Sequence, residues 1–403
     1  MFREEFRKIW RPGMIFVLIV LGFIYYTMFL EFYIRYFPNG PHYEGEFYVA
    51  RQMKETYGTS LSEKEMAEFE TGIPLLQKEA DRYVESSETG KKYGLKTYEQ
   101  YAEFRKNVYD GISGTNKAAD LNETYTDCMI MDNCLQGEAT DNIEGRLYAA
   151  CLFEAQYHQA EKYGTYQTEE GYSPKELEHA RKLFFGPDKK WQNILPEEIP
   201  RVTGTYAGLL LVWICLSVCL LLSPLAVHDR MAGMHVLQYS SRHGRKIYKS
   251  QFAAVMASAF LLVTANLILF GGIFAVHGTS AFFPCRMYSF MGTQYCWPEW
   301  THGTWCLMLV LICYLTAAGA AGMVFFLSDR STNYIGMMLK ILPLFIIFAI
   351  LCPKIMEHAF YFENKLYQLT GIPHIELICA AAVSAAGAVL CWYGSLRAEK
   401  ESV

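Results

Sequence analysis

Six stretches of the chain are apolar over enough residues to cross a membrane as helices. A hydrocarbon core needs roughly 20 helical residues, and in lipid only a helix satisfies its backbone groups within one segment. The predicted transmembrane helices lie at about residues 14–30, 206–227, 252–276, 304–327, 335–352 and 375–393. In the fifth, we expect Lys340 to reach toward the nearer interface and Pro343 to kink the helix.

Basic residues near these stretches gather on one side of the predicted topology. That side holds Arg3, Arg7, Lys8, Arg11, Arg230, Arg242, Arg245, Lys246, Lys249, Arg330, Arg397 and Lys400. The opposite loops after the second span carry only Arg286, Lys354 and Lys365. Because positively charged flanks stay in the cytoplasm, we predict a multi-pass protein of the cell membrane with both termini cytoplasmic.

The long polar segment between the first two spans, residues 31–205, is then predicted to be an extracellular domain. It holds about 30 acidic and about 19 basic residues, as a solvated surface does. Ser62 and Glu65 have the spacing of a capping box. Ser173 followed by Pro174 is typical of a helix start, and residues 97–108 have helical apolar spacing. The predicted fold is mainly α: six transmembrane helices with a mostly helical extracellular domain between helices 1 and 2.

The composition agrees with one apolar part and one ordinary part. Hydrophobic residues make up 52% of the chain and charged residues 19%, while the mean hydropathy of +0.08 is too low for a wholly embedded chain. The net charge of −5 argues against nucleic acid as a partner. Aromatic residues of the third-to-fourth loop are expected to form a belt in the outer interface, with a substrate gate as the alternative. They are Phe282, Phe283, Tyr288, Phe290, Tyr295, Trp297 and Trp300.

The chain contains 12 cysteines, of which seven lie in the predicted spans as small packing residues. A disulfide between Cys285 and Cys296 and a reduced pair are both compatible with their place in an outer loop. Three more, Cys128, Cys134 and Cys151, allow one internal bridge at most. No cysteine or Cys/His group has zinc spacing, so we expect no metal.

The loop between the second and third spans, residues 228–250, carries the most informative motif. A short amphipathic helix is expected to begin at Asp229, near the positive end of its dipole, and to end at Gly244. The pattern reads acidic–Arg–x–x–Gly–x–x–x–Leu–x–x–Ser–Ser–x–x–Gly–Arg. Its members are Asp229, Arg230, Gly233, Leu237, Ser240, Ser241, Gly244 and Arg245.

In sequence and in span order, this loop resembles the first cytoplasmic loop of ABC transporter permeases of the type-2 exporter class. That family usually has Glu where this chain has Asp229. The resemblance implies a coupling helix that docks on a separate cytoplasmic ATPase, which binds ATP and Mg. It also implies a second permease subunit, identical or related, and contacts with membrane lipid. The implied coupling residues are Asp229, Arg230, Gly233, Leu237, Gly244 and Arg245.

The first 13 residues agree with the same resemblance. Phe2, Phe6, Ile9 and Trp10 have the spacing of an interfacial amphipathic helix, which matches the elbow helix of that family. The alternative is an ordinary basic flank with chance periodicity. Residues 353–373, between the last two spans, are expected to form a weakly amphipathic re-entry.

No residue of this chain is expected to perform covalent chemistry or to bind ATP. The glycines of residues 111–115 lack the spacing and the lysine of a phosphate-binding loop. Lys340 and Glu376 are the clear ionisable residues in the spans, and we expect both to be interfacial anchors. The sequence thus predicts an exporter permease for a peptide, lipid or drug-like substrate. The alternative is a membrane sensor or scaffold whose extracellular domain binds a peptide or envelope ligand.

Overall fold

The computed structural model describes residues 2–39, 41–113, 123–137, 141–163, 172–184, 190–233, 244–292 and 295–401. Within these ranges the chain is helical and contains isolated β-bridges but no strand, so the prediction of a mainly α fold is confirmed. The chain divides into two compact units. The membrane unit comprises Met1–Arg35, Pro200–Phe283 and Gln294–Val403, and the inserted domain comprises Tyr36–Ile199 and Pro284–Thr293.

Six helical segments in the described part of the chain are long and apolar enough to span a membrane, as predicted. They are Pro12–Arg35, Glu198–Met231, Ile247–Ala275, His302–Asp329, Tyr334–Met356 and Ile375–Leu396. The chain is therefore a multi-pass membrane protein. A short helix, α1 (Phe2–Ile9), precedes the first span.

Three of the six spans are single helices, and the first and third contain π-helical segments. The first is built from α2 (Pro12–Tyr25), η1 (Tyr26–Leu30) and α3 (Glu31–Arg35). The second is α11 (Glu198–Leu222) continued by α12 (Pro224–Met231). The third is α14 (Gly244–Asn266), η4 (Leu267–Gly271) and α15 (Gly272–Ala275). The remaining three are α16 (His302–Asp329), α17 (Tyr334–Met356) and α19 (Ile375–Glu401).

The second span forms the centre of the membrane unit. Protein covers 78% of its apolar window, against 17% for the first span and 22% for the fifth. Apolar side chains on the fifth, such as Ile335 and Leu339, are largely exposed and face the hydrocarbon region. The first, fifth and sixth spans, of which the protein covers 17%, 22% and 28%, are therefore the most exposed helices of the membrane unit.

Helices α16 and α19 pack against each other through glycines. A Cβ atom added at Gly319 would overlap the backbone of Val383, and one added at Gly387 would overlap Gly319. Gly322 likewise faces Gly387. Small residues let helix backbones approach closely in membranes, where van der Waals packing replaces the hydrophobic effect between helices. These glycines consequently define the contact between the fourth and sixth spans.

The inserted domain is built around α9 (Ile143–Tyr163), which packs against α4 (Pro41–Tyr57) and α5 (Glu63–Ser86). A Cβ at Gly45 would overlap Gly145, so α4 and α9 meet at a glycine pair. The other helices are α6 (Glu88–Tyr93), α7 (Tyr98–Ser113), α8 (Glu123–Leu135) and α10 (Pro174–Phe184). The capping box of Ser62 and Glu65 is present, and helices occur where residues 97–108 and Pro174 predicted them.

A second segment of the chain, Pro284–Thr293, completes the inserted domain. The Phe290 N–H donates to the Trp191 carbonyl at 2.8 Å, and the Leu195 N–H donates to Ser289 Oγ at 3.1 Å. The predicted boundaries of 31–205 did not include this segment. The aromatic belt is also corrected, because Phe282, Tyr288, Phe290, Tyr295 and Trp297 are buried inside the protein, and Phe283 is exposed.

The connection between α17 and α19 folds back on the membrane unit and contains α18 (Lys365–Thr370). The Trp297 N–H donates to the Phe360 carbonyl, and the Phe362 N–H donates to the Tyr295 carbonyl. Phe360 has a positive φ of 69°, and its N–H donates to Glu376 Oε1 at 3.0 Å. Glu376 is 1% exposed, so it is a buried acceptor and not the interfacial anchor that we expected.

The glycine contact between α16 and α19 yields a test of packing. Gly319→Leu should lower the free energy of unfolding by about 2 kcal/mol or more, as overpacking a tight core does. Gly272→Leu is the matched control, since no atom lies within 4 Å of a Cβ built there. Thermal unfolding of both variants in the same detergent measures the difference. Equal stability of the two variants would contradict the close approach.

Candidate functional site

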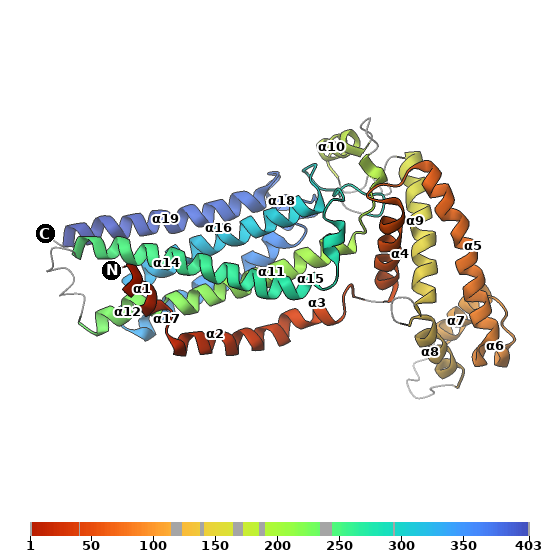
Figure 1. Cartoon of the computed structure of the whole chain (residues 1–403), viewed down its shortest axis with the longest axis horizontal. Coiled ribbons are helices and arrows are strands. Elements are labelled where there is room, and N and C mark those ends of the chain that lie inside the picture. Colours follow the sequence, from red (N-terminus) through yellow and green to blue (C-terminus); the bar gives the residue numbers. More distant parts are fainter. Residues whose placement is uncertain are drawn as a thin grey trace. The chain divides into compact units, whose positions relative to one another are not determined.

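The N-terminal helix α1 lies at the same end of the membrane unit as α12 and the C-terminal end of α19 (Figure 1). The rings of Phe2, Phe6 and Trp10 stack in series, with centroids 6.1 and 6.0 Å apart. Trp10 Nε1 donates to Ser258 Oγ of α14 at 3.0 Å, and Ile9 is buried. The predicted helix is therefore present, and it packs against α14 with Ile9 buried and Phe2 exposed.

A buried polar cluster joins α1, α12 and α14, and we call it the Asp229 cluster. It consists of Glu5, Lys8, Asp229 and Gln251. Lys8 Nζ lies 3.1 Å from Asp229 Oδ2 and 2.9 Å from Glu5 Oε1. Gln251 Nε2 donates to Glu5 Oε2 at 3.2 Å and to Asp229 Oδ2 at 3.1 Å. Each of the four residues thus contacts two of the others. These contacts link α1 to the second and third spans.

The charged groups of the Asp229 cluster are one ammonium and two carboxylates. Asp229 is only 4% exposed, and Glu5 is also buried. Burial by itself lowers the pKa of Lys8, but hydrogen bonds to Glu5 and Asp229 outweigh it and raise that pKa. The ammonium therefore stays charged and shields the two carboxylates from each other. Removing it would take a cation away from two buried carboxylates.

The helix predicted from Asp229 to Gly244 differs from the structure at both of its ends. Asp229 lies in the last turn of α12, not in the first turn of a new helix. A carboxylate near a helix C-terminus is unfavourable, and the contact with Lys8 compensates for it. Gly233, with φ of 69°, follows the end of α12, and Gly244 begins α14 instead of ending a helix. Arg245 also lies in the first turn of α14, and Leu237 falls outside the described residues.

The end of the second span also contacts the fourth and fifth spans. The Arg230 guanidinium lies 4.0 Å from Asp329 Oδ1, at the end of α16. Ser328 Oγ donates to the Ser223 carbonyl at 2.6 Å. His228 Nδ1 lies 3.3 Å from the Tyr334 hydroxyl, at the start of α17. A displacement of the chain next to Gly233 would therefore act on the second to fifth spans and on α1.

Lys340 lies where its side chain can reach this same end of the membrane unit. Its Nζ donates to the Arg330 carbonyl at 2.7 Å and to Ser331 Oγ at 3.3 Å. The ammonium thus satisfies acceptors just beyond the end of α16. Pro343 lies within α17, which is assigned as continuous from Tyr334 to Met356.

An apolar groove of about 510 Å³ lies between the first and third spans, with the second span behind it. Its polar groups are paired: Trp213 Nε1 donates to Asn266 Oδ1 at 2.7 Å. Tyr26 of η1 stacks on Phe270 of η4 with ring centroids 6.1 Å apart, so the two π-helical segments meet at the groove. Single π-helical turns are frequent at functional sites. The lining includes Trp10, Leu18, Phe23, Tyr26, Trp213, Leu262 and Phe270.

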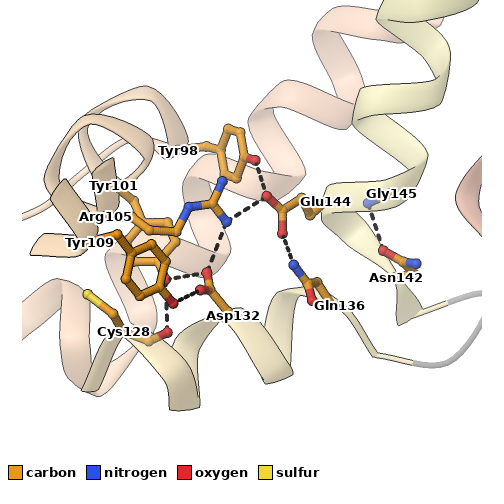
Figure 2. Close-up of polar contacts among 10 residues, drawn as sticks. All are labelled: Tyr98, Tyr101, Arg105, Tyr109, Cys128, Asp132, Gln136, Asn142, Glu144 and Gly145. Atoms are coloured by element: carbon orange, nitrogen blue, oxygen red, sulfur yellow. Dashed lines mark hydrogen bonds and ion pairs between the residues drawn. The ribbon is translucent and has the colours of Figure 1, made fainter. Parts of the chain in front are cut away.

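A second polar network lies in the inserted domain and joins α7, α8 and α9 (Figure 2). Arg105 donates to Asp132 Oδ1 at 2.9 Å and to Glu144 Oε1 at 2.7 Å. Tyrosine hydroxyls donate further hydrogen bonds to the two carboxylates: Tyr98 donates to Glu144, and Tyr101 and Tyr109 donate to Asp132. Glu144 is 2% exposed.

This network has the character of a structural tie. Burial alone lowers the pKa of Arg105, but its hydrogen bonds to Asp132 and Glu144 raise it, so the guanidinium stays charged. Both carboxylates accept bonds from several donors, as a fully satisfied buried network requires. The arrangement fixes three helices relative to one another, and Arg105 forms its ion pairs with carboxylates of the same domain.

The predicted cysteine pair has not been joined in the structure. Cys285 and Cys296 are both buried free thiols, and Cys296 Sγ donates to the Pro298 carbonyl at 3.4 Å. Cys128, Cys134 and Cys151 are also free thiols. A disulfide between Cys285 and Cys296 stays a prediction.

Sequence reasoning found Asp229 but missed two of its partners. Glu5 lies in α1 between the apolar positions Phe2 and Phe6, and Gln251 lies in the first half of α14. An acidic residue near the packed face of an amphipathic helix is the one signal that the sequence offered. Nothing in the sequence indicated which basic residue would pair with it.

Comparison with known proteins yields no match. No protein-family model, no curated protein and no solved structure is significantly similar to the chain.

The Asp229 cluster predicts that Lys8 holds α1 in place. Lys8→Ala should weaken the docking of α1 by about 2 kcal/mol, because it removes the cation that lies between two buried carboxylates. Amide hydrogen exchange of Phe2–Ile9 should then become about 30-fold faster. Arg7→Ala is the control, since the Arg7 side chain is exposed one residue away. Unchanged exchange in Lys8→Ala would show that the cluster does not hold the helix.

The Arg105 network predicts a large loss of stability in the inserted domain. Arg105→Ala should cost about 3 kcal/mol, because it leaves the half-buried Asp132 and the buried Glu144 without their cation. Arg51→Ala, which removes an exposed pair with Glu55 in α4, should cost well under 1 kcal/mol. Chemical denaturation of the full-length protein, followed by hydrogen exchange in α7–α9, measures both. Similar costs for the two variants would contradict the structural role.

Proposed function

We propose that the chain is the membrane-spanning permease subunit of an ATP-driven ABC exporter. One observation carries the proposal: the Asp229 cluster joins the start of the motif loop to α1 and to the third span. A loop that receives force must be mechanically continuous with the helices that it moves. The proposal also rests on the resemblance of residues 229–245 to the coupling loop of that class.

In this proposal, a separate cytoplasmic ATPase binds ATP and Mg, and this chain performs no covalent chemistry. Both termini and the loop after α12 lie on the cytoplasmic side, as the basic flanks predict, and the inserted domain is extracellular. A second permease subunit, identical or related, completes the path. Docking of the ATPase against the segment that follows Gly233 would move the second and third spans together with α1.

The apolar groove supports a substrate with a long hydrophobic part. It is lined almost wholly by aliphatic and aromatic side chains of three spans, and its one polar pair, Trp213 and Asn266, is already hydrogen-bonded. A small polar solute would find few partners there. A lipid or an apolar peptide could enter sideways from the membrane. We therefore place lipids and amphipathic peptides ahead of hydrophilic drugs as substrates.

The first test is the partner. Purification of the full-length chain from its native membrane in mild detergent should bring down an ATPase with a phosphate-binding loop, identified by mass spectrometry. The recovered complex should hydrolyse ATP. A chain that purifies repeatedly without such a subunit, under conditions that keep it folded, would favour the membrane sensor instead.

The second test concerns the coupling segment. Arg230→Glu places like charges beside Asp329, and Gly233→Trp strains a position with φ of 69°. Both variants should insert normally and lose transport, measured as ATP-dependent movement of a fluorescent phospholipid in liposomes with the co-purified ATPase. Lys365→Glu is the matched control, since it reverses an exposed charge on α18, away from the motif loop. Normal transport by both variants would remove the coupling assignment.

A further inference from the structure

Three potential metal ligands converge between two helices of the inserted domain. Glu70 belongs to α5, and Glu154 and His158 belong to α9, which packs against α5. One ligand atom from each residue lies within 4.8 Å of the other two. The spacing of Glu154 and His158, four residues apart, brings both side chains to the same face of α9. Glu70 supplies the third atom from the facing helix.

The hydrogen bonds around His158 already have the form of a metal ligand with its supporting carboxylate. Its Nε2 lies 2.7 Å from Glu70 Oε1, and its Nδ1 lies 3.5 Å from Glu161 Oε2. Metal-binding histidines commonly donate the second ring N–H to a carboxylate, which fixes the tautomer and the ring orientation. Here Glu161 can accept from Nδ1–H, and a metal ion could take the place of the Nε2 proton that now points to Glu70.

The charge around this imidazole is unbalanced. Three carboxylates, those of Glu70, Glu154 and Glu161, surround one histidine, so the group stays anionic even when the ring is protonated. Burial by itself lowers the pKa of His158, but hydrogen bonds to Glu70 and Glu161 raise it. Glu154 is half-buried, and within the described ranges it makes no hydrogen bond or ion pair. Its carboxylate is the acceptor that the protein itself leaves unused.

We propose that Glu70, Glu154 and His158 bind one divalent transition-metal ion, with Zn²⁺ as the best match. One imidazole nitrogen and carboxylate oxygens are donors that Zn²⁺ accepts, and three protein ligands leave a fourth position for water. Ca²⁺ takes six to eight oxygen ligands, more than this group offers. The ion would replace the proton shared by His158 and Glu70 and would bridge α5 to α9.

The proposal does not depend on the transport function, because all the residues concerned belong to the inserted domain. The three ligands do not form a metal-binding motif in the sequence. The two ligands on α9 are four residues apart, but the third lies 84 positions earlier in the sequence. Only the packing of α5 on α9 brings them together.

The experiment uses full-length protein that carries Cys134→Ser and Cys151→Ser, because those two exposed thiols could bind zinc themselves. After treatment with chelator, the protein is titrated with ZnCl₂ in a calorimeter. Binding of CoCl₂, which reports coordination through its visible absorption, is measured in parallel. The parent should show a site that raises the unfolding temperature and gives a tetrahedral cobalt spectrum.

Two variants test the ligands, and one tests specificity. His158→Ala and Glu154→Gln should each weaken Zn²⁺ binding at least 10-fold, the order of loss expected even for supporting groups. Glu154→Gln keeps the fold testable, since that side chain makes no bond in the described structure. Glu99→Gln, an exposed glutamate of α7, is the matched control and should bind like the parent. Absence of a Zn²⁺ site in the parent, or a site unchanged in both ligand variants, would overturn the proposal.

Discussion

The lack of water in the hydrocarbon core is the constraint on which the rest of this structure depends. Each spanning segment must satisfy its own backbone groups, and hydrophobic attraction between helices is lost because lipid is equally apolar. What remains is close packing. The glycine contact of α16 with α19 provides it directly. The same constraint explains why Asn266 is paired with Trp213 inside the membrane unit.

Near the ends of the spans and in the inserted domain, ion pairs connect helices to one another. The Asp229 cluster is the clearest case, since one ammonium serves two carboxylates drawn from different helices. Partly desolvated pairs of this kind contribute little net stability, but they strongly disfavour wrong arrangements. The network around Arg105 in the inserted domain follows the same logic with tyrosine hydroxyls as additional donors (Figure 2).

Much of the architecture was predictable because its signals are local. Hydropathy over about 20 residues marks a span, and the capping box of Ser62 and Glu65 marks a helix start wherever the helix packs. The contacts that define the candidate site are not local. Lys8 and Asp229 are 221 positions apart, and the buried Glu376 accepts a hydrogen bond from the N–H of Phe360, a residue with positive φ. The prediction of an aromatic belt in the third-to-fourth loop was wrong for a related reason. Composition does not distinguish aromatic residues at a membrane interface from aromatic residues in a protein interior.

The segment Pro284–Thr293 affects the order in which the inserted domain can fold during synthesis. The inserted domain consists of two stretches of chain, with the second and third spans encoded between them. During synthesis from the N-terminus, the ribosome must therefore produce both spans before the last piece of the domain exists. The hydrogen-bond partners of Trp191, Asn193 and Leu195 in residues 286–290 are absent until that segment has been synthesised. The inserted domain therefore cannot finish folding until the second and third spans have been synthesised.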